Sequence, residues 1–162
     1  MTVHVANRSP VATSDLVDRA FGLDELEAFC ASVDALVVSV PLTADTTGIV
    51  GREALAAMRH DSVIVNVGRG ATIDETALFE ALRERRIGGA IIDTWYRYPN
   101  PGEPHILPSR LPFHELSNVL MTPHMSGWTS GTIRRRQQVM ADNIRRCFSG
   151  TALVNVVREG RP

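Results

Sequence analysis

Short apolar runs alternate with helical patterns along the chain, and this alternation limits the fold more than any other feature of the sequence. Strands are predicted over residues 3–6, 35–40, 62–67, 89–94 and 118–122, with 153–157 as a sixth candidate. Helices are predicted over residues 24–33, 51–58, 74–86 and 129–148, with Asp74 as an N-cap. Such alternation is typical of βαβ units. The sequence therefore predicts an α/β fold, a Rossmann-type parallel sheet with helices on both faces.

Composition excludes several classes of protein. A chain of 162 residues, 44% hydrophobic and 22% charged, is long enough for one domain with a core. Its formal net charge of -1 gives no field that would attract nucleic acid or an acidic membrane. Cys30 and Cys147 lack metal or redox spacing and favour a reducing compartment. We expect a cytoplasmic protein with no metal site, no nucleic-acid partner and no membrane span.

Three residues suited to catalysis stand where predicted strands end. Arg69 lies between two glycines after the third strand, Asp93 ends the fourth, and His124 follows the fifth. The carboxyl ends of parallel strands share one edge, where α/β sheets bind ligands, so these side chains are expected to converge. A guanidinium beside an imidazole is suited to holding a carboxylate and moving a proton.

Each of these residues also has a purely structural interpretation. Arg69 could be a surface cation, Asp93 could cap a turn, and His124 could simply end a strand. Their joint placement at three successive strand ends favours the functional interpretation. The arginines at 134–136 and 145–146 are more typical of the solvated face of a helix.

The chain resembles the D-isomer-specific 2-hydroxyacid dehydrogenases from about Val3 to Val157. Four motifs carry the resemblance, in the family's order and at similar separations. They are VPLTADTTGIVG (40–51), MRHDSVIVNVGRGATIDETAL (58–78), GGAIIDTW (88–95) and NVLMTPHMSGWT (118–129).

This resemblance implies an oxidoreductase that passes hydride between a nicotinamide and C2 of a 2-oxo or D-2-hydroxy acid. Arg69 would bind the substrate carboxylate and polarise its carbonyl, and His124 would exchange a proton with the 2-oxygen. Asp93 would bond near the nicotinamide carboxamide. Further cofactor contacts would come from Pro41, Thr46, Val67, Gly68, Ser126 and Gly127.

The end of the first predicted strand carries information about the cofactor. Family members that use NAD usually place an acidic residue there to bind the ribose 2′-hydroxyl. This chain has Asn7 and Arg8 instead, and arginine suits the 2′-phosphate of NADP. The resemblance therefore implies NADP or NAD as cofactor, with NADP favoured.

The first departure from the family concerns the partner of the histidine. Members commonly read D-x-F-x-x-E-P, and Tyr98 stands here in the place of the glutamate. A phenol cannot act as a carboxylate counter-ion at neutral pH. The role is therefore expected to be vacant unless Glu103 or Glu115 fills it, both from the proline-rich segment 96–117, which is predicted to be a long ordered loop.

The second departure is the lack of a G-x-G-x-x-G loop, which in the family holds the cofactor pyrophosphate. Residues 1–162 are expected to be a partial NAD(P)-binding domain, the carboxyl-terminal portion of such an enzyme, with no separate substrate domain and no activity alone. The absent strand would lie between 3–6 and 35–40. Segment 3–6 would then detach, pair with 35–40, or leave a gap that another chain fills.

Two other functions stay open. The chain could be a non-catalytic interaction module whose open sheet edges bind a partner, or one subunit of a split dehydrogenase. We expect either a homodimer or a partner chain that completes the sheet, with the proline-rich loop and helix 129–148 as the interface.

Overall fold

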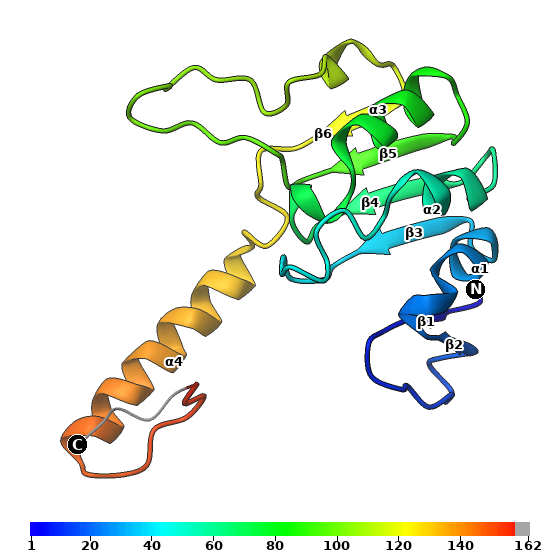
Figure 1. Ribbon diagram of the computed structural model, residues 1–162. Coiled ribbons are helices and arrows are strands. Elements are labelled where there is room, and N and C mark those ends of the chain that lie inside the picture. Colours follow the sequence, from blue (N-terminus) through cyan, green and yellow to red (C-terminus); the bar gives the residue numbers. More distant parts are fainter. Residues whose placement is uncertain (158–162) are drawn as a thin grey trace. The chain divides into compact units, whose positions relative to one another are not determined.

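The computed structural model describes residues 1–157, and the chain forms two compact units that divide between His124 and Met125 (Figure 1). The first unit is built on a parallel sheet of four strands in the order β3-β4-β5-β6. The strands are β3 (Ala35–Val38), β4 (Val63–Asn66), β5 (Gly89–Ile92) and β6 (Val119–Met121). Four of the predicted strands and their parallel arrangement are thus confirmed.

Three helices pack in one layer against this sheet. They are α1 (Leu26–Ala31), preceded by the 3₁₀ helix η1 (Leu23–Glu25), α2 (Arg52–Ala57) and α3 (Glu75–Arg83). Helix α2 contacts both α1 and α3, so the three lie side by side. The predicted N-cap is present, because the Asp74 carboxylate accepts a hydrogen bond from the Ala77 N–H at 2.7 Å.

The two faces of the sheet differ in exposure. Along β3, Leu36 and Val38 are buried beneath the helices, whereas Val37 is 59% exposed. Ile91 and Leu120 lie in the same cross-strand row as Val37 and are 37% and 58% exposed. The Rossmann-type α/β class is confirmed. Within this unit, however, helices cover one face, and the expected second helical layer is not formed.

A separate two-stranded parallel sheet pairs β1 (His4–Ala6) with β2 (Arg19–Phe21), which was not predicted. Strand β1 does not pair with β3, so that arrangement is wrong. Two cavities, of about 230 and 610 Å³, are each lined by residues of both β1 and β3. The four-stranded sheet and the β1–β2 pair are therefore separated by an open gap, which we call the strand slot.

The proline-rich segment is an ordered loop, as predicted. Near its end the segment turns through the 3₁₀ helix η3 (Phe113–Glu115) before β6 begins. Phe113 is 1% exposed and its ring lies 5.2 Å from that of Phe79 on α3. This contact between aromatic rings anchors the end of the loop to the core.

The second unit contains one long helix, α4 (Ser130–Phe148), close to its predicted bounds. Residues 153–157 form bends, so the strand predicted there is wrong. The Asn143 side chain accepts from the Val154 N–H at 2.9 Å and donates to its carbonyl at 3.0 Å. These two bonds hold the segment beside α4 without a strand partner. No helix within residues 1–157 combines the length and apolar character needed to cross a bilayer.

Candidate functional site at the carboxyl edge of the sheet

The register of the sheet determines where Arg69 and His124 stand. Asn66, Ile92 and Met121 form one row across β4, β5 and β6. Arg69 comes three residues after Asn66, and His124 three residues after Met121. Since neighbouring strands are about 4.8 Å apart, their strands lie roughly 10 Å apart at this edge. Both residues therefore belong to one edge of one sheet, as predicted.

Close backbone contacts explain why Arg69 lies between two glycines. A Cβ at Gly68 would lie 2.8 Å from the carbonyl oxygen of Val40, at the end of β3. A Cβ at Gly70 would overlap the carbonyl group of Trp95, beyond β5. The loop fits between these two strand ends only without side chains at both positions. The Arg69 side chain is exposed and donates from Nη1 to the Gly68 carbonyl at 2.7 Å.

Two buried polar side chains, which sequence analysis missed, fix the backbone of Arg69. Asn66, 2% exposed, accepts from the Gly68 N–H at 3.1 Å and donates to the Arg69 carbonyl at 3.0 Å. The Thr72 hydroxyl donates to the same carbonyl at 2.6 Å, from the 3₁₀ helix η2 (Gly70–Thr72). A polar residue at the end of an otherwise apolar strand was the available signal for Asn66.

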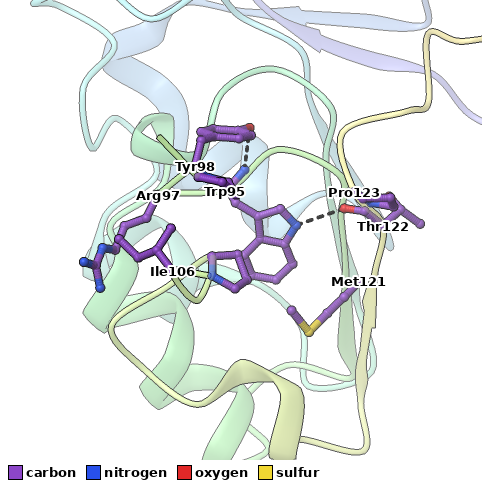
Figure 2. A pocket seen from close by; sticks show the side chains of 9 residues that line it. Trp95, Arg97, Tyr98, Ile106, Met121, Thr122 and Pro123 are labelled. Atoms are coloured by element: carbon purple, nitrogen blue, oxygen red, sulfur yellow. Dashed lines mark hydrogen bonds between the residues drawn. The ribbon is translucent and has the colours of Figure 1, made fainter. Parts of the chain in front are cut away.

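Asp93 is almost fully buried, at 2% exposed, at the end of β5. Its carboxylate accepts from the Thr122 hydroxyl at 2.6 Å. A second hydrogen bond holds the end of β6 at the same residue, because the indole N–H of Trp95 donates to the Thr122 carbonyl at 3.0 Å (Figure 2). Asp93 thus holds the segment that leads from β6 to His124.

Tyr98 contacts His124 directly. Its hydroxyl oxygen lies 2.9 Å from His124 Nδ1, and the two rings are 5.6 Å apart. The same oxygen accepts from the backbone N–H of Trp95 at 3.0 Å. His124 has a φ of 54°, in the left-handed region that non-glycine residues seldom adopt and that often marks functional sites.

This contact corrects the expectation that the histidine's partner would be missing or supplied by a glutamate. Glu103 instead lies 3.8 Å from Arg97, and Glu115 lies 3.9 Å from His114. Trp95 holds Tyr98 near Nδ1, because its backbone N–H donates to the Tyr98 hydroxyl and its indole donates to the Thr122 carbonyl, two residues before His124. The sequence alone could not show that a phenol would reach the ring from this position.

An apolar pocket of about 490 Å³ adjoins Tyr98 (Figure 2). Its lining comes from the segment after β5, from the proline-rich loop and from the end of β6. The residues are Trp95, Arg97, Tyr98, Pro99, Ile106, Pro108, Met121, Thr122 and Pro123. Arg97 is the single charged side chain among them, so the pocket suits an apolar group with a negative charge at its margin.

The remaining predicted contacts lie at other strand ends of the first unit, or in the second unit. Thr46 donates to the Pro41 carbonyl at 2.7 Å and shapes the turn after β3. The Val67 N–H donates to the Val38 carbonyl at 3.1 Å. Asn7 and Arg8 are both exposed, directly after β1. Ser126 and Gly127 belong to the second unit.

Comparison with known proteins identifies the family. Residues 1–126 match the NAD-binding domain of the D-isomer specific 2-hydroxyacid dehydrogenases. The chain is 41% identical over 128 residues to hydroxyphenylpyruvate reductase of Plectranthus scutellarioides, covering 76% of this chain and 37% of the relative. It is 35% identical over 133 residues to glyoxylate/hydroxypyruvate reductase B of Pectobacterium carotovorum, covering 82% and 39%.

A solved structure agrees with this assignment. NADPH-dependent glyoxylate/hydroxypyruvate reductase of Sinorhizobium meliloti, in complex with NADP and malonate, is 30% identical with a TM-score of 0.75. The match covers 99% of this chain and 48% of that one, so the chain spans about half the length of the solved relative. The chain belongs to the D-isomer specific 2-hydroxyacid dehydrogenase family, and its matched part is the family's NAD-binding domain.

Proposed function

We propose that Arg69 and His124 are the catalytic residues of an NAD(P)-dependent oxidoreductase that acts on 2-oxo acids and D-2-hydroxy acids. The observation that carries the proposal is that each residue follows the same cross-strand row by three positions, Arg69 after β4 and His124 after β6. These two strands lie about 10 Å apart. A small 2-oxo acid placed between them could meet the guanidinium with its carboxylate and the imidazole with its carbonyl oxygen.

The roles follow from the chemistry of the two side chains. Arg69 binds the substrate carboxylate through paired N–H donors and places positive charge beside the carbonyl oxygen. When bound, the reduced nicotinamide supplies the hydride that adds to C2. Protonated His124 gives a proton to the 2-oxygen, so the ketone becomes a hydroxyl, and in the reverse direction the neutral ring takes that proton back.

The residues present fit part of the cofactor. Gly68 lets the loop pack against the Val40 carbonyl at the end of β3, and Val67 beside it is 37% exposed and open to a ligand. We propose that Pro41, Thr46, Val67, Gly68, Asp93, Ser126 and Gly127 line the cofactor. Asn7 and Arg8 would contact the ribose 2′-phosphate, which favours NADP over NAD.

No G-x-G-x-x-G loop is present in the sequence to hold the pyrophosphate. We therefore propose that residues 1–162 act as a partial NAD(P)-binding domain that binds cofactor weakly and is inactive without a partner. The strand slot supports a partner chain. The edge of β1 opposite β2 and the edge of β3 opposite β4 are both unpaired within the described sheets. An inserted parallel strand would pair with both.

The uncovered row of Val37, Ile91 and Leu120 lies on the face next to this slot, and Val37 also lines both cavities. We propose that a strand and a following helix from outside residues 1–162 cover this row. Where they belong to a separate chain, the arrangement is a split dehydrogenase. The homodimer, with the proline-rich loop and α4 as its interface, and the cytoplasmic location both stay predictions.

The test combines cofactor titration with complementation. The chain is first titrated alone with NADPH and with NADH by calorimetry. The titrations are then repeated after the chain is mixed with a second polypeptide, the part of the Pectobacterium reductase that lies outside the matched region. We expect no measurable binding by the chain alone. The mixture should bind NADPH more tightly than NADH and oxidise it with glyoxylate or hydroxypyruvate.

Variants separate catalysis from assembly. In the mixture, Arg69→Ala and His124→Ala should each lower kcat/KM for the 2-oxo acid by about 10²-fold or more. His60→Ala, an exposed residue outside the proposed site, should not. Complexes that form with full affinity but never turn over, whichever variant is used, would support the interaction module and contradict the catalytic proposal.

A further inference from the structure

We infer that Tyr98 is a positioning residue that sets where the proton sits on the imidazole of His124. The inference starts from the two contacts of one oxygen. Tyr98 Oη accepts from the Trp95 backbone N–H at 3.0 Å and lies 2.9 Å from His124 Nδ1. Trp95 is itself fixed, since it is 6% exposed and its indole donates to the Thr122 carbonyl at 3.0 Å.

A phenol carries a single proton, so its donor capacity is one hydrogen bond. The backbone N–H of Trp95 can only donate, and it occupies one acceptor site on Oη. If Tyr98 donates to Nδ1, every group in this short chain of bonds is paired. If instead Nδ1 carried a proton, two N–H groups would point at Oη and the phenol proton would have to turn to solvent.

The neutral imidazole is therefore held in the tautomer with its proton on Nε2. The family's glutamate would have the opposite effect, because a carboxylate only accepts hydrogen bonds and draws the ring proton to Nδ1. The exchange of glutamate for Tyr98 thus reverses the direction of the hydrogen bond behind the histidine while keeping a partner at the same nitrogen.

The contact between Tyr98 and Nδ1 also fixes the orientation of the His124 ring. With Nδ1 occupied by Tyr98, Nε2 is the nitrogen left to face a ligand, and it presents an N–H donor. The catalytic meaning of this step rests on the proposed function, in which His124 meets the substrate's 2-oxygen. A neutral ring with its proton on Nε2 can donate a hydrogen bond to that oxygen, whereas taking a proton back in the reverse direction requires the tautomer with the ring proton on Nδ1. The proton position itself depends only on the geometry, and it can be measured in the chain without cofactor or substrate.

Long-range ¹H–¹⁵N correlation spectra of the ¹⁵N-labelled chain at about pH 8.5, where imidazoles are ordinarily neutral, report which ring nitrogen carries the proton. His124→Gln assigns the signals. We expect the Nε2–H pattern in the natural sequence. Tyr98→Phe removes the hydrogen-bond donor. The ¹⁵N chemical shifts of both ring nitrogens should then move toward the averaged values of a ring that exchanges between its two tautomers. Tyr98→Glu should shift the pattern to Nδ1–H.

Tyr96→Phe is the matched control. It removes the same hydroxyl from a neighbouring tyrosine, whose buried hydroxyl has no hydrogen-bond partner among residues 1–157, and it should leave the His124 pattern unchanged. A natural chain with the proton on Nδ1, or a Tyr98→Phe chain with an unchanged pattern, would overturn the inference. Either result would leave the dehydrogenase proposal standing, because turnover is measured separately. Conversely, an Nε2–H pattern without turnover in the complemented mixture would leave the inference intact.

Discussion

Tyr96 and Tyr98 stand two residues apart in opposite surroundings. Tyr98 is 45% exposed and its hydroxyl has two partners, the Trp95 N–H and His124. Tyr96 is largely buried against Phe113, with ring centroids 6.3 Å apart, and no described residue lies within hydrogen-bond reach of its buried hydroxyl. Leaving such a group unpaired costs about 1–3 kcal/mol.

Tyr96→Phe should therefore keep or raise the free energy of unfolding, by up to about 1 kcal/mol at neutral pH. Burial, with smaller contributions from Glu75 and Asp74, raises the pKa of Tyr96. The folded state thus favours the neutral phenol, and this contribution to stability is lost as pH rises above about 10, the ordinary tyrosine value. Urea unfolding across that range should show a smaller loss for Tyr96→Phe.

The comparison has a built-in control. Burial, aided by the charge of Glu27, raises the pKa of Cys30 to about 11, so Cys30 also reduces stability in alkali. Both proteins share Cys30, so the difference between their pH profiles isolates Tyr96. Parallel profiles for the two proteins would show that the hydroxyl of Tyr96 reaches water in the folded state.

At the level of single residues, the sequence predicted where side chains lie better than how they bond. Arg69, Asp93 and His124 could be placed because strand ends in a parallel sheet share an edge. Asn66 and Tyr98 could not, since their importance depends on a carbonyl and a ring nitrogen brought close by backbone turns. Chemical type alone excluded a phenol as a carboxylate counter-ion and did not predict a hydrogen bond to the histidine.

At the level of elements, the loop that carries Arg69 is held by two strand ends. Gly70→Ala should destabilise the protein by about 1–3 kcal/mol, because the new methyl overlaps the Trp95 carbonyl group and can be accommodated only if the backbone moves. Chemical denaturation measures the loss. Gly127→Ala, where no atom lies within 4 Å of the added Cβ, should change stability by less than about 0.5 kcal/mol.

The same substitution tests whether the loop geometry matters for catalysis. In the complemented mixture, Gly70→Ala should lower kcat/KM together with stability, because it displaces the Arg69 backbone away from Asn66 and Thr72. Unchanged turnover in a destabilised Gly70→Ala protein would show that Arg69 tolerates a moved loop.

Element prediction succeeded where burial and periodicity agreed. The strands of the four-stranded sheet carry apolar runs of three or four residues, and α3 has an N-cap aspartate followed by a buried face. Strand β2 was missed because three residues, Arg19 to Phe21, with one buried side chain give no readable pattern. The strand prediction for residues 153–157 was wrong. A valine-rich run favours a strand, but here the Asn143 side chain makes the hydrogen bonds to the Val154 backbone that a neighbouring strand would otherwise make.

At the level of the whole molecule, the two sheets of the first unit differ in how many of their strands are paired on both sides. Strands β4 and β5 are paired on both sides, whereas β1 is paired on one side with the short, edge strand β2. Native-state hydrogen exchange should therefore protect the amides of β4 and β5 up to global unfolding and those of β1 and β2 much less. Addition of a slot-filling partner should slow exchange in β1 and β3 most. Equal protection of both sheets without a partner would contradict the open slot.

The unfilled slot also bears on the fate of the chain in a crowded cell. Two facing strand edges and an apolar row at Val37, Ile91 and Leu120 do not discriminate strongly among extended apolar segments. While the slot is unfilled, strands of other copies and of unrelated unfolded proteins can pair with these edges. The solubility of residues 1–162 should therefore rise with any strand that fills the slot, whether that strand belongs to the same polypeptide or to another chain.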